Sequence, residues 1–182
     1  MKFSSSKGFS LVETIVALGV LTTGVLGAAA VLATGMQNLS SSPADVVTTQ
    51  KAAEAMEAVF SARQSGKLPW AQLKNVNGAS GSDGGIFLDG PRPLNWPGDD
   101  GLVNTADDAV KGLETVTLPG LDLLMNTPDD RVVPLSNFTR EILIRDVAGE
   151  NGQLRLIVVT VTYRNGATTR NYVLTTYMSS YS

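Results

Sequence analysis

Residues 9–33 read FSLVETIVALGVLTTGVLGAAAVLA, a run of 25 residues in which Glu13 is the single formal charge. At a rise of about 1.5 Å per residue, a helix of this length crosses a hydrocarbon layer of roughly 30 Å. The segment before it, MKFSSSKG, is polar and carries Lys2 and Lys7. Positive charge of this kind holds a segment in the cytoplasm. The stretch therefore predicts a membrane-spanning helix that sends the rest of the chain outward.

An ordinary secretory signal peptide is the alternative interpretation of this stretch. Its apolar region has about 7 to 15 residues and ends in a small-residue cleavage site. The apolar run here is longer, and Glu13 stands near its start. A carboxylate inside a membrane helix is costly and usually has a functional partner. A cut between Gly8 and Phe9 would create an α-amine one helical turn from Glu13, or beside the Glu13 of a neighbouring parallel chain.

These residues carry a resemblance: KGFSLVETIVALGVL resembles the class III signal of type IV prepilins and pseudopilins. The resemblance implies that a membrane prepilin peptidase cuts after Gly8 and methylates Phe9, the new N-terminus. It also implies that Glu13 guides subunits into a filament. The partners to expect are then the peptidase, other pilin subunits bound through the N-terminal helix, and inner-membrane assembly machinery. The expected location is the inner membrane, as a single-pass protein, and afterwards an extracellular or periplasmic filament.

Small residues recur along the same run at helical spacing. Gly24 with Ala28, and Thr23 with Gly27, are each four residues apart. Such pairs let membrane helices approach closely. The alternative interpretation is that glycine and alanine are simply common in membrane helices, and both interpretations keep the segment helical.

The stretch that follows predicts a turn and then an amphipathic helix. Residues 38–43 (NLSSSP) offer Ser41 or Ser42 as an N-cap and Pro43 at the first helical position. Residues 44–64 place apolar side chains at helical spacing, with Lys51, Glu54, Glu57 and Arg63 on the other side. Residues 35–64 are therefore the predicted amphipathic second half of the N-terminal helix.

The remainder of the chain divides into a loop region and a sheet. Residues 65–135 are rich in Gly, Pro, Asn and Asp and predict a long loop with brief strands. Three β-branched runs follow at 140–147, 154–163 and 170–178, and an Asn-Gly pair separates the last two. Residues 136–182 therefore predict a three-stranded antiparallel meander. The expected fold class is α+β, with the helix of residues 9–34 and 35–64 packed on this C-terminal sheet, after the leader of residues 1–8.

The composition of the chain excludes several classes of function. The 182 residues include no His and no Cys, so imidazole acid–base chemistry and disulfides are excluded. A net charge of −3 with scattered Lys and Arg gives no basic stripe for nucleic acid. Phosphate-binding Gly-Lys loops and Gly-x-Ser-x-Gly elbows are also missing from the sequence. We therefore expect no enzyme and no nucleic-acid partner.

An acidic loop in the middle of the chain leaves two interpretations open. Residues 98–108, GDDGLVNTADD, contain Asp99, Asp100, Asn104, Asp107 and Asp108, and the NT-x-DD pattern recurs 22 positions later at residues 126–130. Oxygen-rich, glycine-containing loops of this kind hold calcium through about 6 to 8 ligands, although the spacing is not that of an EF-hand. Solvated Asx turns are the alternative.

The resemblance, taken over the whole chain, implies a structural filament subunit. The closing run VTVTYRNGATTRNYVLTTYMSS, together with GVLGAAAVLATG near the start, is most similar to V-type minor pilins and I-type pseudopilins. The expected function is that of a minor pilin in a type IV pilus-like filament. A pseudopilin of a type II secretion system is the nearest alternative, and a membrane-tethered binding domain or enzyme is the alternative from another class.

Overall fold

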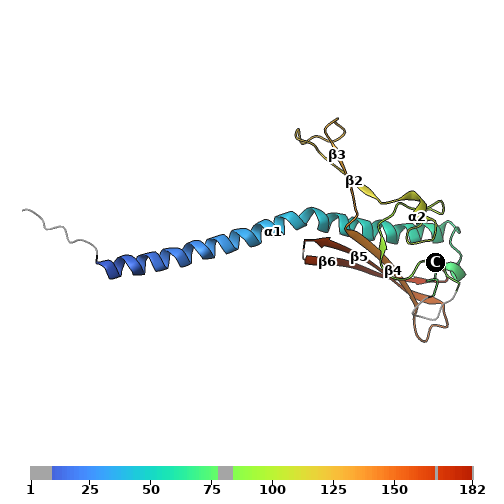
Figure 1. Cartoon of the computed structure of the whole chain (residues 1–182). Helices are drawn as coiled ribbons and strands as arrows, with labels where there is room; N and C mark the ends of the chain where they lie inside the picture. Colours follow the sequence, from blue (N-terminus) through green and yellow to red (C-terminus); the bar gives the residue numbers. More distant parts are fainter. Residues whose placement is uncertain (1–9, 78–83, 167, 182) are drawn as a thin grey trace, which may run out of the picture. The chain divides into compact units, whose positions relative to one another are not determined.

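The structure is a computed structural model, and it describes residues 10–77, 84–166 and 168–181, with the side chains of residues 37–42 left aside. It consists of an N-terminal apolar helix and a C-terminal antiparallel sheet joined by a region of short elements (Figure 1). The chain forms two compact units, residues 1–43 and residues 44–182, each of which is described by itself. The α+β layout predicted from the sequence is confirmed.

Helix α1 runs from Leu11 to Gln64. Its first turn is capped by Ser10, whose Oγ accepts a hydrogen bond of 3.2 Å from the Glu13 N–H. The turn predicted at residues 38–43 is wrong, because the helix continues through Pro43. Proline lacks an N–H and so removes one hydrogen bond of the helix, which the bonds on either side tolerate. The boundary between the two compact units falls directly after this residue in the chain.

The second half of α1 supplies one side of the core of the second unit. Its buried apolar residues are Ala52, Ala55, Met56, Val59 and Ala62, which recur three or four positions apart as an amphipathic helix requires. The prediction that Lys51 lies on the outer side is wrong, because Lys51 is also buried. Glu54 and Glu57 are exposed as predicted.

The main sheet has four antiparallel strands in the order β1-β4-β5-β6. They are β1 (Arg92–Pro93), β4 (Phe138–Asp146), β5 (Leu154–Asn165) and β6 (Thr168–Ser179). Along β4 and β5 every second residue is buried, so one face of the sheet belongs to the core. The three predicted strands of the meander are therefore found, and Gly166, at a φ of 60°, opens the turn between β5 and β6.

Besides β1, four short elements lie between the helix and the meander. They are a 3₁₀ turn η1 (Trp70–Gln72), helix α2 (Asp108–Lys111) and strands β2 (Thr115–Leu118) and β3 (Arg131–Pro134). Strands β2 and β3 pair only with each other and form a separate two-stranded sheet (Figure 1). We call residues 115–134 the arm. The predicted loop region thus contains more regular structure than its composition indicates.

Candidate functional site

The apolar half of α1 is the first candidate site. Within the described residues, Leu11–Met36 is the one helical segment long and apolar enough to cross a membrane. All of its large apolar side chains are exposed in the single chain. An apolar surface of this extent requires lipid or other apolar helices to cover it.

Polar groups within this segment are satisfied by the helix itself. The hydroxyl of Thr22 donates to the Leu18 carbonyl at 2.8 Å, that of Thr23 to the Val20 carbonyl at 2.9 Å, and that of Thr34 to the Ala30 carbonyl at 3.0 Å. A hydroxyl that is already paired costs little to place in hydrocarbon. Gly24 and Gly27 leave open space beside the helix backbone. This surface therefore suits close contact with another helix.

Glu13 remains the one charge on this surface, in the first turn of α1. The positive end of the helix dipole favours an acid at this place. No described residue forms an ion pair with it. Gly8 and Phe9 lie outside the described residues, so the predicted cut and the pairing of Glu13 with a new α-amine stay predictions.

The acidic loop is the second candidate site, and the structure shows how it closes. We call residues 97–108 loop 1. The Asp107 carboxylate accepts hydrogen bonds from the Asp99 and Asp100 N–H groups at 2.7 and 3.3 Å. The Asp108 carboxylate accepts from the N–H groups of Gly98 at 3.1 Å and Asn104 at 2.5 Å. These two aspartates therefore organise the backbone of the loop.

The pKa values of the two aspartates shift in opposite directions because their surroundings differ. The Thr105 hydroxyl, 2.8 Å from Asp107 Oδ1, holds the pKa of Asp107 below its usual value. Burial raises the pKa of Asp108, against the opposing hydrogen bonds from Asn104, Gly98 and Thr105. Asp99 instead points to Lys111, with which it forms an exposed ion pair of 2.8 Å.

The five predicted calcium ligands are close in the chain, but the hydrogen bonds of their side chains go to other groups of the protein. Among the described residues, no three acidic side chains are grouped so that they could hold a metal ion. Asn104 is buried and turned toward the sheet, where its Nδ2 donates to the Arg140 carbonyl at 2.8 Å. Asp100 makes the bond of an Asx turn, because its Oδ1 accepts from the Leu102 N–H at 2.8 Å. The Asp107 and Asp108 carboxylates instead accept from N–H groups three to ten residues earlier in the chain. Calcium binding stays a prediction.

A second loop repeats the first in detail. We call residues 119–130, at the tip of the arm, loop 2. Its Asp129 carboxylate accepts from the Leu121 and Asp122 N–H groups, and its Asp130 carboxylate accepts from the Asn126 and Thr127 N–H groups. Gly98 and Gly120 have the same role, which is to leave room for the aspartate that closes each loop. A Cβ at either position would lie 2.1 Å from the carboxylate of that aspartate. The 22-residue repeat in the sequence is therefore also a structural repeat.

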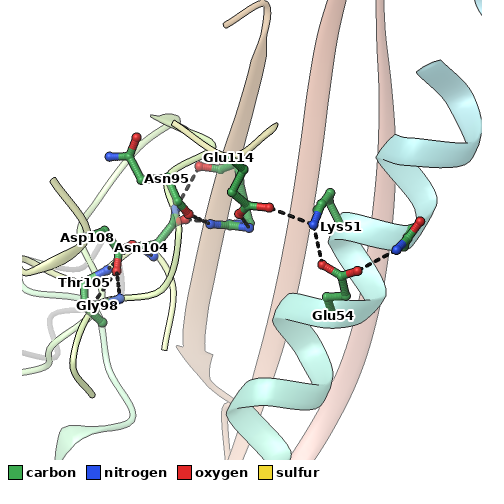
Figure 2. A network of polar contacts seen from close by, with 10 residues as sticks. Lys51, Glu54, Asn95, Gly98, Asn104, Thr105, Asp108 and Glu114 are labelled. Carbon is green, nitrogen blue, oxygen red and sulfur yellow. Dashed lines mark hydrogen bonds and ion pairs between the residues drawn. The ribbon is translucent and has the colours of Figure 1, made fainter. Parts of the chain in front are cut away.

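A buried ionic cluster joins α1, the start of the arm and the sheet (Figure 2). Lys51 Nζ lies 2.8 Å from Glu114 Oε2 and 2.7 Å from Glu54 Oε2. On the other side of Glu114, Oε1 accepts a hydrogen bond of 3.1 Å from Arg140 Nη1. Arg140 also donates through Nε to the Asn104 side chain at 2.9 Å. Loop 1, the arm and the helix are thereby held by one network.

Electrostatics within the cluster favours the charged forms of Lys51 and Glu54. Burial lowers the pKa of Lys51, but hydrogen bonds to Glu114 and Glu54 outweigh it, and the net pKa lies above the usual value. Burial raises the pKa of Glu54, yet hydrogen bonds from Lys51 and Gln50 bring it below its usual value. Burial also lowers the pKa of Arg140, which Glu114 partly opposes.

This cluster was not predicted from the sequence, although the alternation of strand β4 carries one signal for it. Arg140 alternates in phase with Ile142 and Ile144, which a half-buried strand directs to the core. An inward arginine requires a carboxylate partner. The helical spacing of residues 44–64 instead places Lys51 on the outer face of its helix.

Comparison of the chain with protein-family models, with curated proteins and with solved structures gives no match.

Proposed function

We propose that this chain is a structural subunit, a minor pilin, of a type IV pilus-like filament. In this proposal it is inserted in the inner membrane, cut after Gly8 by prepilin peptidase and assembled through α1. The observation that carries the proposal is the exposed apolar half of α1, with Glu13 as its single charge, on the same chain as an antiparallel α+β unit. No catalytic role is assigned to any residue.

Glu13 has a definite role in this proposal. A carboxylate in hydrocarbon is stabilised when a cation meets it, and the new amine of a neighbouring chain would supply that cation. Such a pair would form only when subunits stand side by side. The acid would therefore set the axial position of one helix against the next, while the apolar side chains supply contact area.

Glu13→Ala tests the role of the acid. Insertion should be unchanged or improved because a costly charge is removed, whereas incorporation into sheared filaments should fall by about tenfold, equivalent to ~1.4 kcal/mol. Membrane fractionation and filament shearing measure the two quantities separately. Glu57→Ala is the matched control, since Glu57 is an exposed acid on the second half of the same helix.

Normal incorporation of Glu13→Ala would contradict the assembly role of Glu13. The pseudopilin alternative predicts the same behaviour of Glu13 but a different consequence of deleting the gene. Loss of surface filaments would support the pilus subunit, and loss of secreted enzymes with filaments intact would support the pseudopilin. A membrane-tethered enzyme or binding domain predicts neither loss.

A further inference from the structure

Loop 1 shows how this repeated motif binds to a protein surface. Its apolar pair, Leu102 and Val103, is 3% and 4% exposed within the core. Asn104, at a φ of 63°, accepts a hydrogen bond of 2.7 Å from the Leu88 N–H through its carbonyl. Its side chain donates to a carbonyl of strand β4. The motif therefore offers an apolar pair and an asparagine that bonds to extended backbone.

Loop 2 presents the same groups without a partner surface. Leu124 and Met125, which correspond to Leu102 and Val103, are 62% and 51% exposed. Asn126 has a φ of 66°, close to that of Asn104, and is also exposed. Because Asp129 and Asp130 already fix the loop, little conformational entropy remains to be lost on binding. The arm thus carries a binding motif in its bound conformation.

The outer edge of the main sheet offers a matching surface. In the described part of the chain, β6 pairs with β5 and with no other strand. This 12-residue edge contains no proline, lysine or acid, the residues by which proteins protect an exposed edge. Tyr172, Val173 and Tyr177 are exposed on it. An edge of this composition provides both extended backbone and apolar side chains.

The two surfaces also have opposite charge. The arm contains Asp122, Asp129 and Asp130 against one cation, Arg131. The Thr127 hydroxyl, which donates to Asp129 Oδ1 at 2.7 Å, holds the pKa of Asp129 below its usual value. Strands β5 and β6 with their turn contain three arginines and no acid. Arg164 and Arg170 are exposed, but Arg170 forms an ion pair of 3.2 Å with Asp45 of α1, so Arg164 carries the charge contrast with the arm. Opposite potentials of this kind select and orient partners.

From these features we infer that the arm of one copy of this chain docks on the β6 edge of a second copy. Loop 2 places its apolar pair against the exposed side chains of β6, and Asn126 bonds to the backbone around Val173 on the outer edge of that strand as Asn104 bonds to β4. The inference rests on the proposed function, in which subunits stand side by side in a filament. It adds that two copies of this chain are neighbours and assigns the surface through which their second units meet.

Cysteine cross-linking of the full chain tests the contact, because the chain has no native cysteine. Two tagged copies are expressed together, one with Leu124→Cys and the other with Val173→Cys. Mild oxidation should give a disulfide-linked product carrying both tags, in membranes as well as in filaments. Val110→Cys paired with Val173→Cys is the control, because Val110 is 86% exposed on α2, away from loop 2, and should give no such product.

A second variant tests the role of Asn126. Asn126→Gly keeps the positive φ and removes the side chain, and it should slow formation of the product by about fivefold, the effect of one lost hydrogen bond. Asn151→Gly is its matched control, because Asn151 is an exposed asparagine at positive φ in the turn between β4 and β5. It should leave the rate unchanged.

Several results would overturn the inference. One is a disulfide-linked product that forms only between two Leu124→Cys chains, and another is a product that forms only with a different protein. The third is the absence of any product while the variants still enter filaments. In the last case the proposed function stands and the contact falls. If instead the product forms in membranes while the chain keeps its leader and never enters filaments, the proposed function falls and the contact stands.

Discussion

Arg140 is a charged residue within the core face of the sheet, and its environment explains why that is tolerated. Its side chain is 2% exposed, and it bonds to Glu114, to the Asn104 amide oxygen and to the Asn95 carbonyl. A buried charge is stable only when its partners are in place. Glu114 is the essential partner, because it neutralises Lys51 as well as Arg140.

Glu114→Gln should therefore destabilise the second unit strongly. The substitution leaves Lys51 and Arg140 buried without their shared carboxylate, and we expect the free energy of unfolding to fall by about 3 kcal/mol. Tryptophan fluorescence during denaturation of the full chain in detergent measures it, since Trp70 and Trp96 both belong to this unit.

Glu54→Gln is the matched control for this change. Glu54 bonds to the same Lys51 Nζ, but its side chain is 47% exposed against 3% for Glu114. Exposed ion pairs contribute about 0 to 1 kcal/mol. Equal losses in the two variants would contradict the view that burial of Glu114 determines its contribution.

At the scale of elements, the two loops show that one motif can be buried in one place and exposed in another. Both close through the same aspartate bonds to backbone N–H groups. Loop 1 is buried through Leu102, Val103 and Asn104, whereas loop 2 projects its equivalents into solvent. The repeat in the sequence predicts the shared geometry of the two loops. It does not predict their burial, because burial depends on which of the two loops packs against the core.

Calcium binding is tested on these elements. If the acids of loop 1 share a calcium ion, the chain should melt higher with calcium, by the equivalent of about 2.7 kcal/mol at a hundredfold excess over the dissociation constant. Asp107→Ala should abolish the difference between melting with and without calcium. Magnesium should substitute poorly, because it requires tighter octahedral geometry.

An unchanged melting temperature at millimolar calcium would favour plain Asx turns. In that case Asp107→Ala should lower stability equally with and without the ion. The loss would then reflect the hydrogen bonds from the Asp99 and Asp100 N–H groups and from the Thr105 hydroxyl.

At the scale of the whole molecule, processing of the N-terminus is the decisive prediction. The mature chain should begin at Phe9, with a methylated amine, because only that cut places a cation beside Glu13. Mass spectrometry of the N-terminal peptide from membranes and from filaments measures it. A start at Met1, or after Ala30, would contradict the prepilin interpretation. Gly8→Ala, which alters the residue before the cut, should leave the leader attached if that interpretation is right.

The sequence predicts the large elements of this molecule well, for a physical reason. The apolar run and the alternation in β4 and β5 are local patterns, and each is repeated over many residues. The continuation of α1 through Pro43 is not evident from the sequence, because residues 38–43 (NLSSSP) are all typical of turns except Leu39. Helical stretches on both sides nevertheless extend across them. The cluster of Lys51, Glu114 and Arg140 joins residues far apart in the chain, and local patterns carry little information about such contacts.

The arm is attached to the rest of the second unit at the buried cluster, so a force on the arm acts on that cluster. The arm begins just after Glu114 and ends just before Leu135, and these two residues are buried and joined by a hydrogen bond of 2.9 Å. A pull on the tip of the arm would therefore arrive at a clamped base. From there the load passes through Glu114 to Lys51 on α1 and to Arg140 on β4. We expect tension on this protein to be shared between helix and sheet instead of peeling the arm away.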